Sequence, residues 1–466
     1  MSKTTAFNPY LPSWEYIPDG EPHVFDDRVY IYGSHDFANG HVFCLGDYVC
    51  WSAPVDDLGN WRYEGVIYGR CDDPLNKDGK MCLYAPDVTK GPDGRYYLYY
   101  VLDRAAVISV AVCDTPAGRY EFLGYVHYPD GTRLGEREGD EPQFDPGVLT
   151  EGDVTYVYTG FSPIDDNTRV GSKVAVLDKD MLTVISDPVM VVPNVLNSKG
   201  TDFEGYAFFE ASSIRKFNGK YYFIYSSEHF HELCYAVSDS PLGGFRYGGV
   251  LVSNADVGID SYKPADMAMA FGANNHGSIV EICGELYIFY HRHTNGTWYS
   301  RQACAEKLTL RPDGHFNQSE LTSCGLNGGP LEGKGEYPSY IACNLFTEKH
   351  SAYLGDLNDP KIVQDGKDSE KEQGYIANIV DGVTAGFKYF DCNGVTAVSV
   401  TTRGHGIGEF EVRTKWDGEI IGRIKIESVN FWETFTGNIA LPDGVNAIYL
   451  TYRGEGKTML KSFTLK

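Results

Sequence analysis

The sequence lacks several patterns that define common protein classes. No run of about 18 apolar residues occurs, so no transmembrane helix is expected. The opening residues MSKTTAFNPYLPSWEYIPDGEP are polar and Pro-rich and do not have the charged-then-apolar order of a secretion signal. The 11 cysteines are scattered without CxxC spacing, which favours small buried side chains in a reducing compartment over disulfides or a zinc site. We therefore expect a cytoplasmic protein.

Positive charge is also scarce, because 40 Lys and Arg residues stand against 64 Asp and Glu residues, for a net charge of −24. Such a surface repels phosphate backbones and anionic lipid, so neither nucleic acid nor a membrane is the expected partner. A neutral ligand is favoured instead.

Convincing helical periodicity is missing from the first 330 residues. What is abundant is aromatic residues and glycine, with 34 Tyr, 24 Phe and 52 Gly. Aromatic side chains suit pleated, half-buried strands, and glycine suits the tight turns between them. A chain of 466 residues is too long for one ordinary core, so two or three domains of this all-β kind are expected.

A repeat organises the N-terminal region. Five tyrosine-rich segments follow Gly- or Asp-containing turns, which is typical of the second arm of a hairpin: 28–36, 95–102, 154–161, 220–228 and 285–293. Their marker tyrosines, Tyr30, Tyr97, Tyr156, Tyr222 and Tyr287, are separated by 67, 59, 66 and 65 residues. Five units of this length with four strands each predict a five-bladed β-propeller over residues 1–330.

The repeat also predicts where polar side chains meet. One polar residue precedes each marker tyrosine by 10 to 12 residues: Asp19, Asp87, Asp145, Glu210 and His276. Equivalent positions on the innermost strands of a propeller converge on its central axis. Four carboxyl groups and one imidazole are therefore expected to surround a single funnel.

Clustered carboxyl groups cannot all ionise freely, because burial and neighbouring charge separate their pKa values. A glycosidase uses such a separation, with one protonated acid at the leaving oxygen and one carboxylate on the other side of the sugar. Glu210 lies among Phe208, Phe209 and Ala211, where desolvation suits a general acid. Asp19 lies in a polar turn that suits a general base, and Asp145 could hold Glu210 protonated.

These residues lie in segments that resemble glycoside hydrolase family 43, and most closely its β-xylosidase and α-L-arabinofuranosidase members. The similar segments are DGEPHVFDDRVYIYGSHD (19–36), LYAPDV (83–88), FDPGV (144–148), FFEASSIRK (208–216), NNHGSI (274–279), FYHRH (289–293) and SRQACAEKL (300–308). The resemblance covers roughly residues 7–330. It implies an inverting mechanism with Asp19 as general base, Asp145 as pKa modulator and Glu210 as general acid.

The chain also departs from the family pattern. At the first site the family usually has Asp-Pro, whereas this chain has Asp19-Gly20 followed by Glu21-Pro22. Glu21 is therefore a second candidate for the general base. Only Asp19 keeps the usual distance of eight residues to Asp27. The aromatic residue before Ala-Pro-Asp is Tyr84, which is expected to form one wall of the substrate site.

Further residues are assigned to the substrate site. Asp87 and Arg292 are expected to line the funnel, whereas His35 and Asp36 are interpreted as structural residues of the first blade. His276 resembles the family's axial histidine, which implies a structural calcium or sodium ion at the propeller axis; the other interpretation is a core histidine bonded to carboxylates. Neither metal catalysis nor an organic cofactor is indicated.

Residues 331–346 break the repeat and are interpreted as a connector. Seven or eight short alternating strands are predicted in 347–466, which favours a jelly-roll-like β-sandwich. This region resembles family 6 carbohydrate-binding modules. Trp416 and Trp432 are candidates for stacking on sugar, although packing against the propeller is the favoured role.

The predicted function is exo-acting removal of terminal β-D-xylose or α-L-arabinofuranose from xylan- or arabinan-derived oligosaccharides. An endo-arabinanase and a non-catalytic sugar-binding propeller are the alternatives. The sequence leaves open the choice between the two sugars, the linkage and the oligomeric state.

Overall fold

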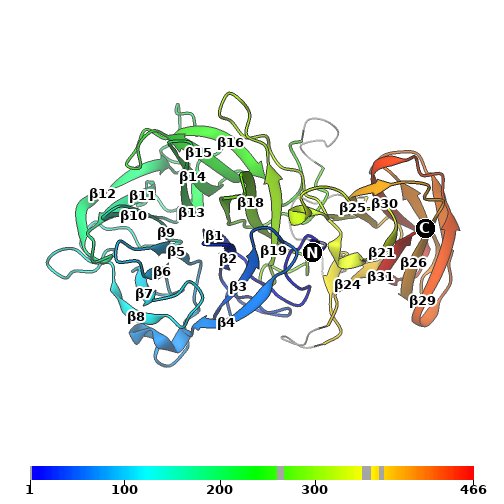
Figure 1. Cartoon of the computed structure of the whole chain (residues 1–466), viewed down its shortest axis with the longest axis horizontal. Coiled ribbons are helices and arrows are strands. Elements are labelled where there is room, and N and C mark those ends of the chain that lie inside the picture. The colour runs from blue at the N-terminus through cyan, green and yellow to red at the C-terminus, as the bar shows by residue number, and fades with distance from the viewer. Residues whose placement is uncertain (1–2, 260–266, 349–357, 367–371) are drawn as a thin grey trace.

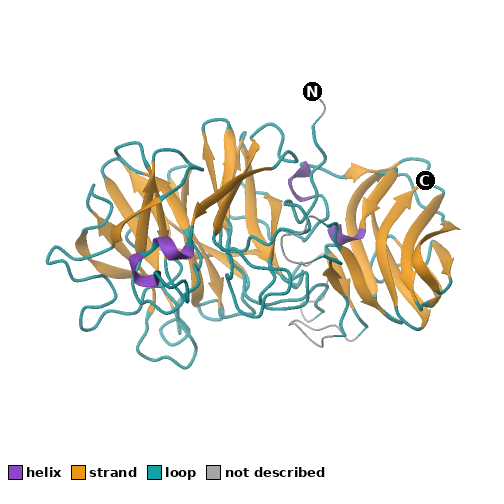
Figure 2. Ribbon diagram, turned by 90° about the horizontal axis from the view of Figure 1, so that it is seen from below, coloured by secondary structure: helices purple, strands orange, loops and turns teal. Residues whose placement is uncertain are grey.

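The computed structural model describes residues 3–259, 267–348, 358–366 and 372–466, which are almost entirely strands, turns and loops (Figures 1 and 2). The helices of these residues are short 3₁₀ turns: η1 (Arg70–Asp72), η2 (Pro74–Asn76), η3 (Gly325–Asn327) and η4 (Ser339–Ile341). Within the described ranges no helix is long and apolar enough to cross a bilayer. The prediction of an all-β chain is confirmed.

Up to residue 308 the described strands form five antiparallel sheets, each built from consecutive strands. The first two contain β1 (Glu21–Phe25), β2 (Arg28–Tyr32), β3 (Tyr48–Pro54) and β4 (Arg62–Tyr68), then β5 (Asp87–Lys90), β6 (Tyr96–Tyr100), β7 (Ser109–Cys113) and β8 (Glu121–Tyr125). The next two contain β9 (Gly147–Glu151), β10 (Val154–Thr159), β11 (Gly171–Leu177) and β12 (Val184–Pro193), then β13 (Phe208–Phe217), β14 (Lys220–Ser227), β15 (Leu233–Ser238) and β16 (Arg246–Val252). The fifth contains β17 (Ser278–Ile282), β18 (Glu285–Arg292) and β19 (Gln302–Leu308).

The first strands of these sheets contact one another in a closed cycle: β1 with β5, β5 with β9, β9 with β13, β13 with β17, and β17 with β1. In Figure 1 the labels β1, β5, β9 and β13 lie near the middle of this part, and β4, β8, β12 and β16 lie at its rim. Sheets packed radially in this way are the blades of a β-propeller.

Tight turns join the first two strands of the blades. Asn218 and Gly219 both have positive φ, 52° and 75°, as do Cys283 and Gly284, at 52° and 81°. Positive φ at both central residues is the requirement of the two-residue turn that matches the twist of antiparallel strands. The tyrosine-rich second strands lie largely in the interior; for example, all five residues of β6, which follows the longer turn 91–95, are buried.

The N-terminal segment lies along the last propeller strand. The amide of Tyr10 donates to the carbonyl oxygen of Ala303, and the side chain of Asn8 bonds both the amide and the carbonyl of Ala305. Residues from the start of the chain therefore cover the outer edge of β19 and tie the first blade to the last.

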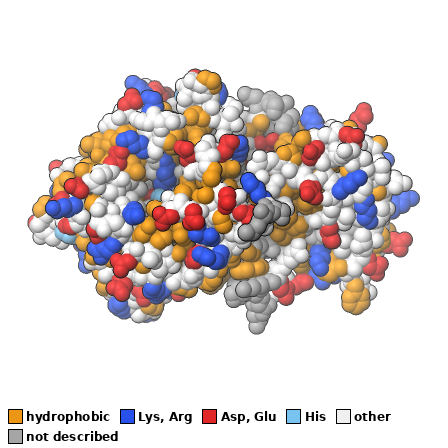
Figure 3. All heavy atoms as spheres, in the orientation of Figure 1, with side chains coloured by type: hydrophobic (Ala, Val, Ile, Leu, Met, Phe, Trp, Pro, Cys, Tyr) orange, Lys and Arg blue, Asp and Glu red, His pale blue; other side chains and the backbone are white. Residues whose placement is uncertain are grey.

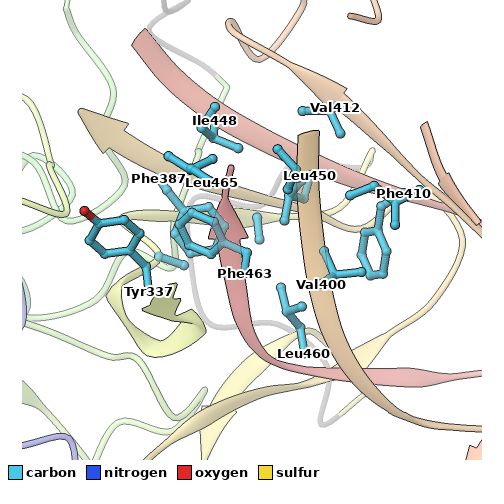
Figure 4. Packing of buried hydrophobic residues seen from close by; sticks show 14 of the residues in the cluster. Tyr337, Phe387, Val400, Phe410, Val412, Ile448, Leu450, Leu460, Phe463 and Leu465 are labelled. Atoms are coloured by element: carbon cyan, nitrogen blue, oxygen red, sulfur yellow. The ribbon is translucent and has the colours of Figure 1, made fainter. Parts of the chain in front are cut away.

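The C-terminal part contains two sheets of six strands each. One contains β20 (Leu331–Glu332), β22 (Asn344–Phe346), β25 (Thr384–Cys392), β27 (Ile407–Arg413), β28 (Gly422–Ile426) and β30 (Gly444–Glu455). The other contains β21 (Gly335–Pro338), β23 (Lys361–Val363), β24 (Tyr375–Ile379), β26 (Ala397–Gly404), β29 (Val429–Asn438) and β31 (Thr458–Leu465). Apolar side chains from both sheets pack together in one core, with Phe387 against Phe463 at its centre (Figure 4).

The segment 331–346, expected to be a connector, differs from that expectation. Its strands β20 and β22 pair with β25, and β21 pairs with β31. The segment is therefore part of the C-terminal sheets. The short strands interrupted by Gly and Pro gave no alternation long enough to indicate this pairing from sequence.

A buried ion cluster links the two parts of the chain. The ammonium group of Lys388, on β25, lies 2.9 Å from Asp256 and 2.8 Å from Glu320 of the propeller side. The side chains of Lys388 and Asp256 are 0% and 1% exposed. Asn344 of β22 also donates to Asp256, at 2.8 Å. Charged groups buried this deeply must keep their partners, so the cluster fixes the C-terminal part to the propeller.

On the surface, by contrast, acidic and basic side chains are interspersed over the face shown in Figure 3.

Replacing Lys388 by methionine is expected to lower the free energy of unfolding by about 3–5 kcal/mol, because the buried Asp256 would lose the ammonium group that lies 2.9 Å from it. Chemical denaturation at neutral pH measures the loss. The matched control is Lys415→Met, which removes a half-exposed partner of Asp417 and is expected to cost less than about 1 kcal/mol. Equal small effects of both substitutions would contradict a cluster that joins the two parts.

Candidate active site

The pairing of the first two strands in each blade divides the axial residues into two tiers. In each blade one residue of the first strand pairs with the second residue after the marker tyrosine. These five residues form what we call the axial tier: Glu21, Asp87, Gly147, Ser213 and Ser278. Two residues earlier in the chain lie Asp19, Ala85, Asp145, Ala211 and His276, which we call the entrance tier. Glu210 is next to this tier because β13 has a register shift on each side of it.

Asp87 therefore belongs to the deeper tier, in contrast to the prediction that it lines the funnel with Asp19. The reason is the turn of its hairpin. Lys90 pairs with Tyr96 across residues 91–95, whereas Phe25 pairs with Arg28 across residues 26–27. The turn is longer, but the marker Tyr97 also lies one residue nearer to it than Tyr30 does to its own turn, so the net shift is one residue. Ala85 therefore takes the entrance position in this blade.

A cavity of about 350 Å³ opens above the entrance tier. It is lined by Asp19, Phe43, Cys44, Tyr84, Ala85, Asp103, Phe144, Asp145, Phe161, Glu210, Asn274, His276 and Arg301. Five of the residues predicted from sequence are thus brought together: Asp19, Tyr84, Asp145, Glu210 and His276. Tyr84 meets Phe144 edge to face, and Phe144 packs on Phe161, so one wall is aromatic and the floor carries the charges.

Asp19 is held by a buried arginine. Its Oδ1 lies 2.9 Å from Nη1 of Arg301, and its own amide donates to Nδ1 of His291 at 3.1 Å. Asp36 accepts from Nε and Nη2 of Arg301, at 2.8 and 3.1 Å, which orients the guanidinium and agrees with a structural role for Asp36. His35, also interpreted as structural, bonds Glu15.

Arg301 itself was not singled out by the sequence reasoning. It occupies the position before the first residue of β19, in the segment SRQACAEKL. The available signal was its place at the start of the strand that closes the propeller, where a side chain can reach the first blade.

Asp145 and Glu210 lie side by side along the floor. Oδ2 of Asp145 accepts from the amide of Ala211 at 3.2 Å and lies 3.7 Å from Nδ1 of His276. The backbone is left-handed at Asp19, Asp145 and Ala211, with φ of 57°, 43° and 67°. Non-glycine residues rarely adopt this conformation, and such strain is concentrated at functional sites.

The electrostatics of the floor separate the carboxyl groups. Burial, followed by the negative charges of Asp145 and Asp19, raises the pKa of Glu210 to about 8. Burial raises the pKa of Asp145 to about 7, although the charge of His276 opposes this shift. Glu210 keeps 14% of its side chain exposed, so the more strongly proton-binding carboxyl group also faces the cavity.

His276 bridges the two tiers. Its Nε2 lies 3.5 Å from Oε1 of Glu21, and its Nδ1 faces Asp145. Burial lowers its pKa, but the Glu21 carboxyl group 3.5 Å away and the charges of Asp145 and Asp19 outweigh burial and raise the pKa to about 9. Both ring nitrogens of His276 therefore face carboxyl oxygens of the chain itself. The core interpretation of His276 is therefore favoured over the metal-ligand interpretation.

Arg292 also differs from its predicted place. Its guanidinium donates to the carbonyl oxygens of Ala342 and Cys343, which belong to the segment leading into β22. The neighbouring His291 faces Asp19. Successive residues of a strand point to opposite sides, so Arg292 is directed away from the cavity and toward the C-terminal part.

In the C-terminal part, Trp432 lies on β29 with its ring covered by the chain's own cations. The guanidinium of Arg403 is 4.4 Å from the ring centre, the ammonium of Lys461 is 5.8 Å away, and Tyr375 packs edge to face. These contacts favour a structural role. Trp416, the other candidate, lies between β27 and β28.

A glycoside hydrolase uses two carboxyl groups of different pKa, one as an acid and one as a carboxylate. The cavity has buried carboxyl groups of this kind beneath an aromatic wall. Residues 17–316 match the family model described as "Glycosyl hydrolases family 43". The chain belongs to glycosyl hydrolases family 43 and is thus a glycosidase.

Individual relatives agree with this membership. A "Xylosidase/arabinosidase" of Thermoclostridium stercorarium is 65% identical over 466 residues, which cover 98% of each chain. A "Xylosidase/arabinosidase" of Bacteroides ovatus is 32% identical over 60% of this chain and 87% of its own.

Solved structures are similar as well. A family 43 β-xylosidase/α-arabinofuranosidase from a compost metagenome, in complex with xylotriose and described as a calcium-free form, is 26% identical, with a TM-score of 0.52. It covers 68% of this chain and 98% of its own. An arabinoxylan arabinofuranohydrolase of Bacillus subtilis, 20% identical and with a TM-score of 0.53, covers 99% of both chains, which shows a shared fold.

Replacing Arg301 by methionine is expected to lower the free energy of unfolding by about 3–5 kcal/mol at pH 7, because two buried carboxylates would lose their cation. Burial already raises the pKa of Asp36, and loss of Arg301 would raise it further. In the folded variant Asp36 then takes up a proton as the pH falls, at a higher pH than in the unfolded chain. The difference in the free energy of unfolding between wild type and variant should therefore shrink between pH 7 and pH 4.

Denaturation curves over this pH range measure the difference. Arg246→Met, at an arginine whose side chain is 76% exposed, is the control. A deficit independent of pH would show that Arg301 stabilises by packing rather than by charge.

Proposed function

We propose that the protein is an exo-acting, inverting glycosidase that removes terminal β-D-xylose, α-L-arabinofuranose or both from xylan- or arabinan-derived oligosaccharides. The observation that carries the proposal is the pocket itself, in which Asp19, Asp145 and Glu210 share the floor of one cavity. The names of the relatives, xylosidase/arabinosidase, point to the same pentoses.

The size of the cavity supports exo-action. About 350 Å³ is near the lower end of the range for ligand pockets, roughly 300–1,000 Å³. Such a space suits the terminal unit of an oligosaccharide. An endo-arabinanase would bind several units on both sides of the cleaved bond, in a groove rather than in a pocket, and is the less favoured alternative.

In the proposed mechanism, Glu210 is the general acid and Asp19 the general base. Glu210 retains its proton near neutral pH, because burial and nearby negative charge raise its pKa to about 8. It can therefore protonate the leaving oxygen. Asp19, paired with the permanently charged Arg301, accepts a proton from water that attacks the anomeric carbon from the other side. Asp145 supplies the charge that keeps the proton on Glu210.

The contacts of Glu21 argue against its role as the base. Its Oε2 binds Arg215 and Ser213, and its side chain is 1% exposed. Asp19 lines the cavity, one tier nearer the substrate. A substrate-bound water could reach Asp19 without displacing the residues of the axial tier.

The architecture proposed with this function is a five-bladed propeller followed by a β-sandwich. Five sheets whose first strands close a cycle support the blade number within the described residues. Two sheets that share one core support the sandwich. We also propose a cytoplasmic site of action on imported oligosaccharides, which agrees with 11 cysteines that are all free in the structure.

Wild-type protein is expected to release nitrophenol from nitrophenyl β-D-xylopyranoside, nitrophenyl α-L-arabinofuranoside or both. The Asp19→Asn substitution is expected to lower kcat/KM by about 10²–10⁴-fold, because it removes the base. Proton NMR of the first-formed sugar should show the inverted anomer. The matched control is Asp239→Asn, at an aspartate whose side chain is 86% exposed. A wild type inactive on both glycosides would favour endo-cleavage or pure sugar binding, and an active Asp19→Asn variant would transfer the base role to Glu21.

The alkaline limb of kcat/KM is expected to follow Glu210, with activity falling as pH rises through about 8 because the acid loses its proton. Asp145→Asn removes a charge that raises this pKa, so the limb should move to lower pH by about one unit or more. A pH–rate profile of wild type and variant measures the shift. An unmoved limb would mean that another group is the acid or that Asp145 acts only by geometry.

A further inference from the structure

We infer that Arg215 is a built-in cation of the axial tier, standing where a metal ion would otherwise bind, so that the protein needs no divalent cation at the propeller axis. This inference concerns a site beneath the proposed active site and depends on the proposed function only where activity is measured.

The axial tier does contain a set of residues that could hold a metal. Ligand atoms of Glu21, His23 and Asp87 all lie within 4.8 Å of one another, and the two acids are buried. Carboxylate oxygens are what calcium prefers. From residue types alone, this group agrees with the expectation of an axial ion.

The side chain of Arg215 enters this group from β13. Its Nη2 lies 2.5 Å from Oε2 of Glu21 and 3.2 Å from Nε2 of His23, and its Nη1 lies 3.6 Å from Oδ2 of Asp87. Its side chain is only 12% exposed. A guanidinium carries a permanent positive charge and spreads its donors in a plane, so one side chain can face both carboxylates.

The remaining lone pairs of the group are also in use. Oδ1 of Asp87 accepts from the amide of Val88 at 2.7 Å and lies 2.7 Å from Nε2 of His23. Oδ2 of Asp87 accepts from the amide of Val148 at 2.8 Å. A metal ion would have to break these bonds to bind His23 or Asp87.

Glu21 has one oxygen without a hydrogen bond among the described residues, Oε1. This oxygen faces Nε2 of His276 at 3.5 Å. Arg215 already places a permanent positive charge beside both buried carboxyl groups. A divalent ion would have to displace this guanidinium or add to its positive charge in a buried site, which is costly.

The same contacts connect Arg215 to the active site. They lead from Arg215 to Glu21, from Glu21 to His276, and from His276 to Asp145 on the cavity floor. Arg215 is thus a positioning residue: it fixes Glu21, which in turn holds His276 beneath Asp145. In this protein a side chain performs the electrostatic task that a structural ion could perform.

The first test uses the wild-type protein. After treatment with EDTA, neither the melting temperature nor kcat/KM is expected to change, and adding 10 mM CaCl₂ is expected to raise the melting temperature by less than about 1 °C, because a ligand stabilises only what it binds. A fall in melting temperature with EDTA that CaCl₂ reverses would overturn the inference. So would one equivalent of a divalent metal in the purified protein by elemental analysis.

The second test creates the metal site. Arg215→Met leaves Glu21 and Asp87 facing each other without their cation, so this variant is expected to melt lower than the wild type and to regain about 3 °C or more with 10 mM CaCl₂. The double variant Glu21→Gln, Arg215→Met removes one carboxylate and is expected to lose the calcium response. Arg246→Met is the control for removal of an arginine elsewhere.

Absence of a calcium response in Arg215→Met would contradict the idea that the guanidinium stands in for an ion. If this variant does not fold, the EDTA and CaCl₂ experiment on the wild type still shows whether the propeller axis needs a divalent cation. Melting temperatures do not depend on catalysis, so a wild type inactive on both pentosides would refute the proposed function and leave this test intact.

Discussion

The compensation of buried charge at the propeller axis is the constraint on which the rest of the structure depends. Five strands converge there, and their polar side chains are shielded from water. Glu21 and Asp87 require Arg215, and Asp19 and Asp36 require Arg301. Asp145 and Glu210 are the members without a direct arginine partner among the described residues. These two retain protons most strongly, so incomplete compensation is what produces acid chemistry in this pocket.

Much of this arrangement could be predicted from the sequence, because the tyrosine repeat fixes the hairpins and each hairpin fixes a position near the axis. Asp19, Asp145, Glu210 and His276 lie on the cavity as expected. Asp87 does not, because spacing to a marker tyrosine cannot distinguish a two-residue turn from a five-residue turn. A net change of one residue in the distance between a strand residue and its marker tyrosine changes which residue reaches a given depth.

Other features depend on contacts between distant segments, which residue types in one segment do not predict. Arg301 pairs with Asp19 across 282 residues, and Arg215 pairs with Glu21 across 194. A lone arginine is most often a surface residue, so neither residue type nor position predicts these pairings. Arg292 was the expected site residue because it lies in the fifth tyrosine-rich segment, 285–293, yet strand alternation directs it toward the C-terminal part. Lys388 gave no sign of burial, since only the docked propeller supplies Asp256 and Glu320.

The contact of the N-terminal segment with β19 has a consequence for the order in which the protein is made. Asn8 and Tyr10 leave the ribosome before their partners Ala303 and Ala305, which follow almost 300 residues later. At about 5–20 residues per second, this interval is on the order of 15–60 s, during which earlier blades can fold but the ring stays open. Because Arg301 belongs to the same late segment, Asp19 also waits for its cation. The nascent chain therefore has no complete catalytic pocket until ring closure, and closure is a contact of high sequence separation, the kind that forms slowly.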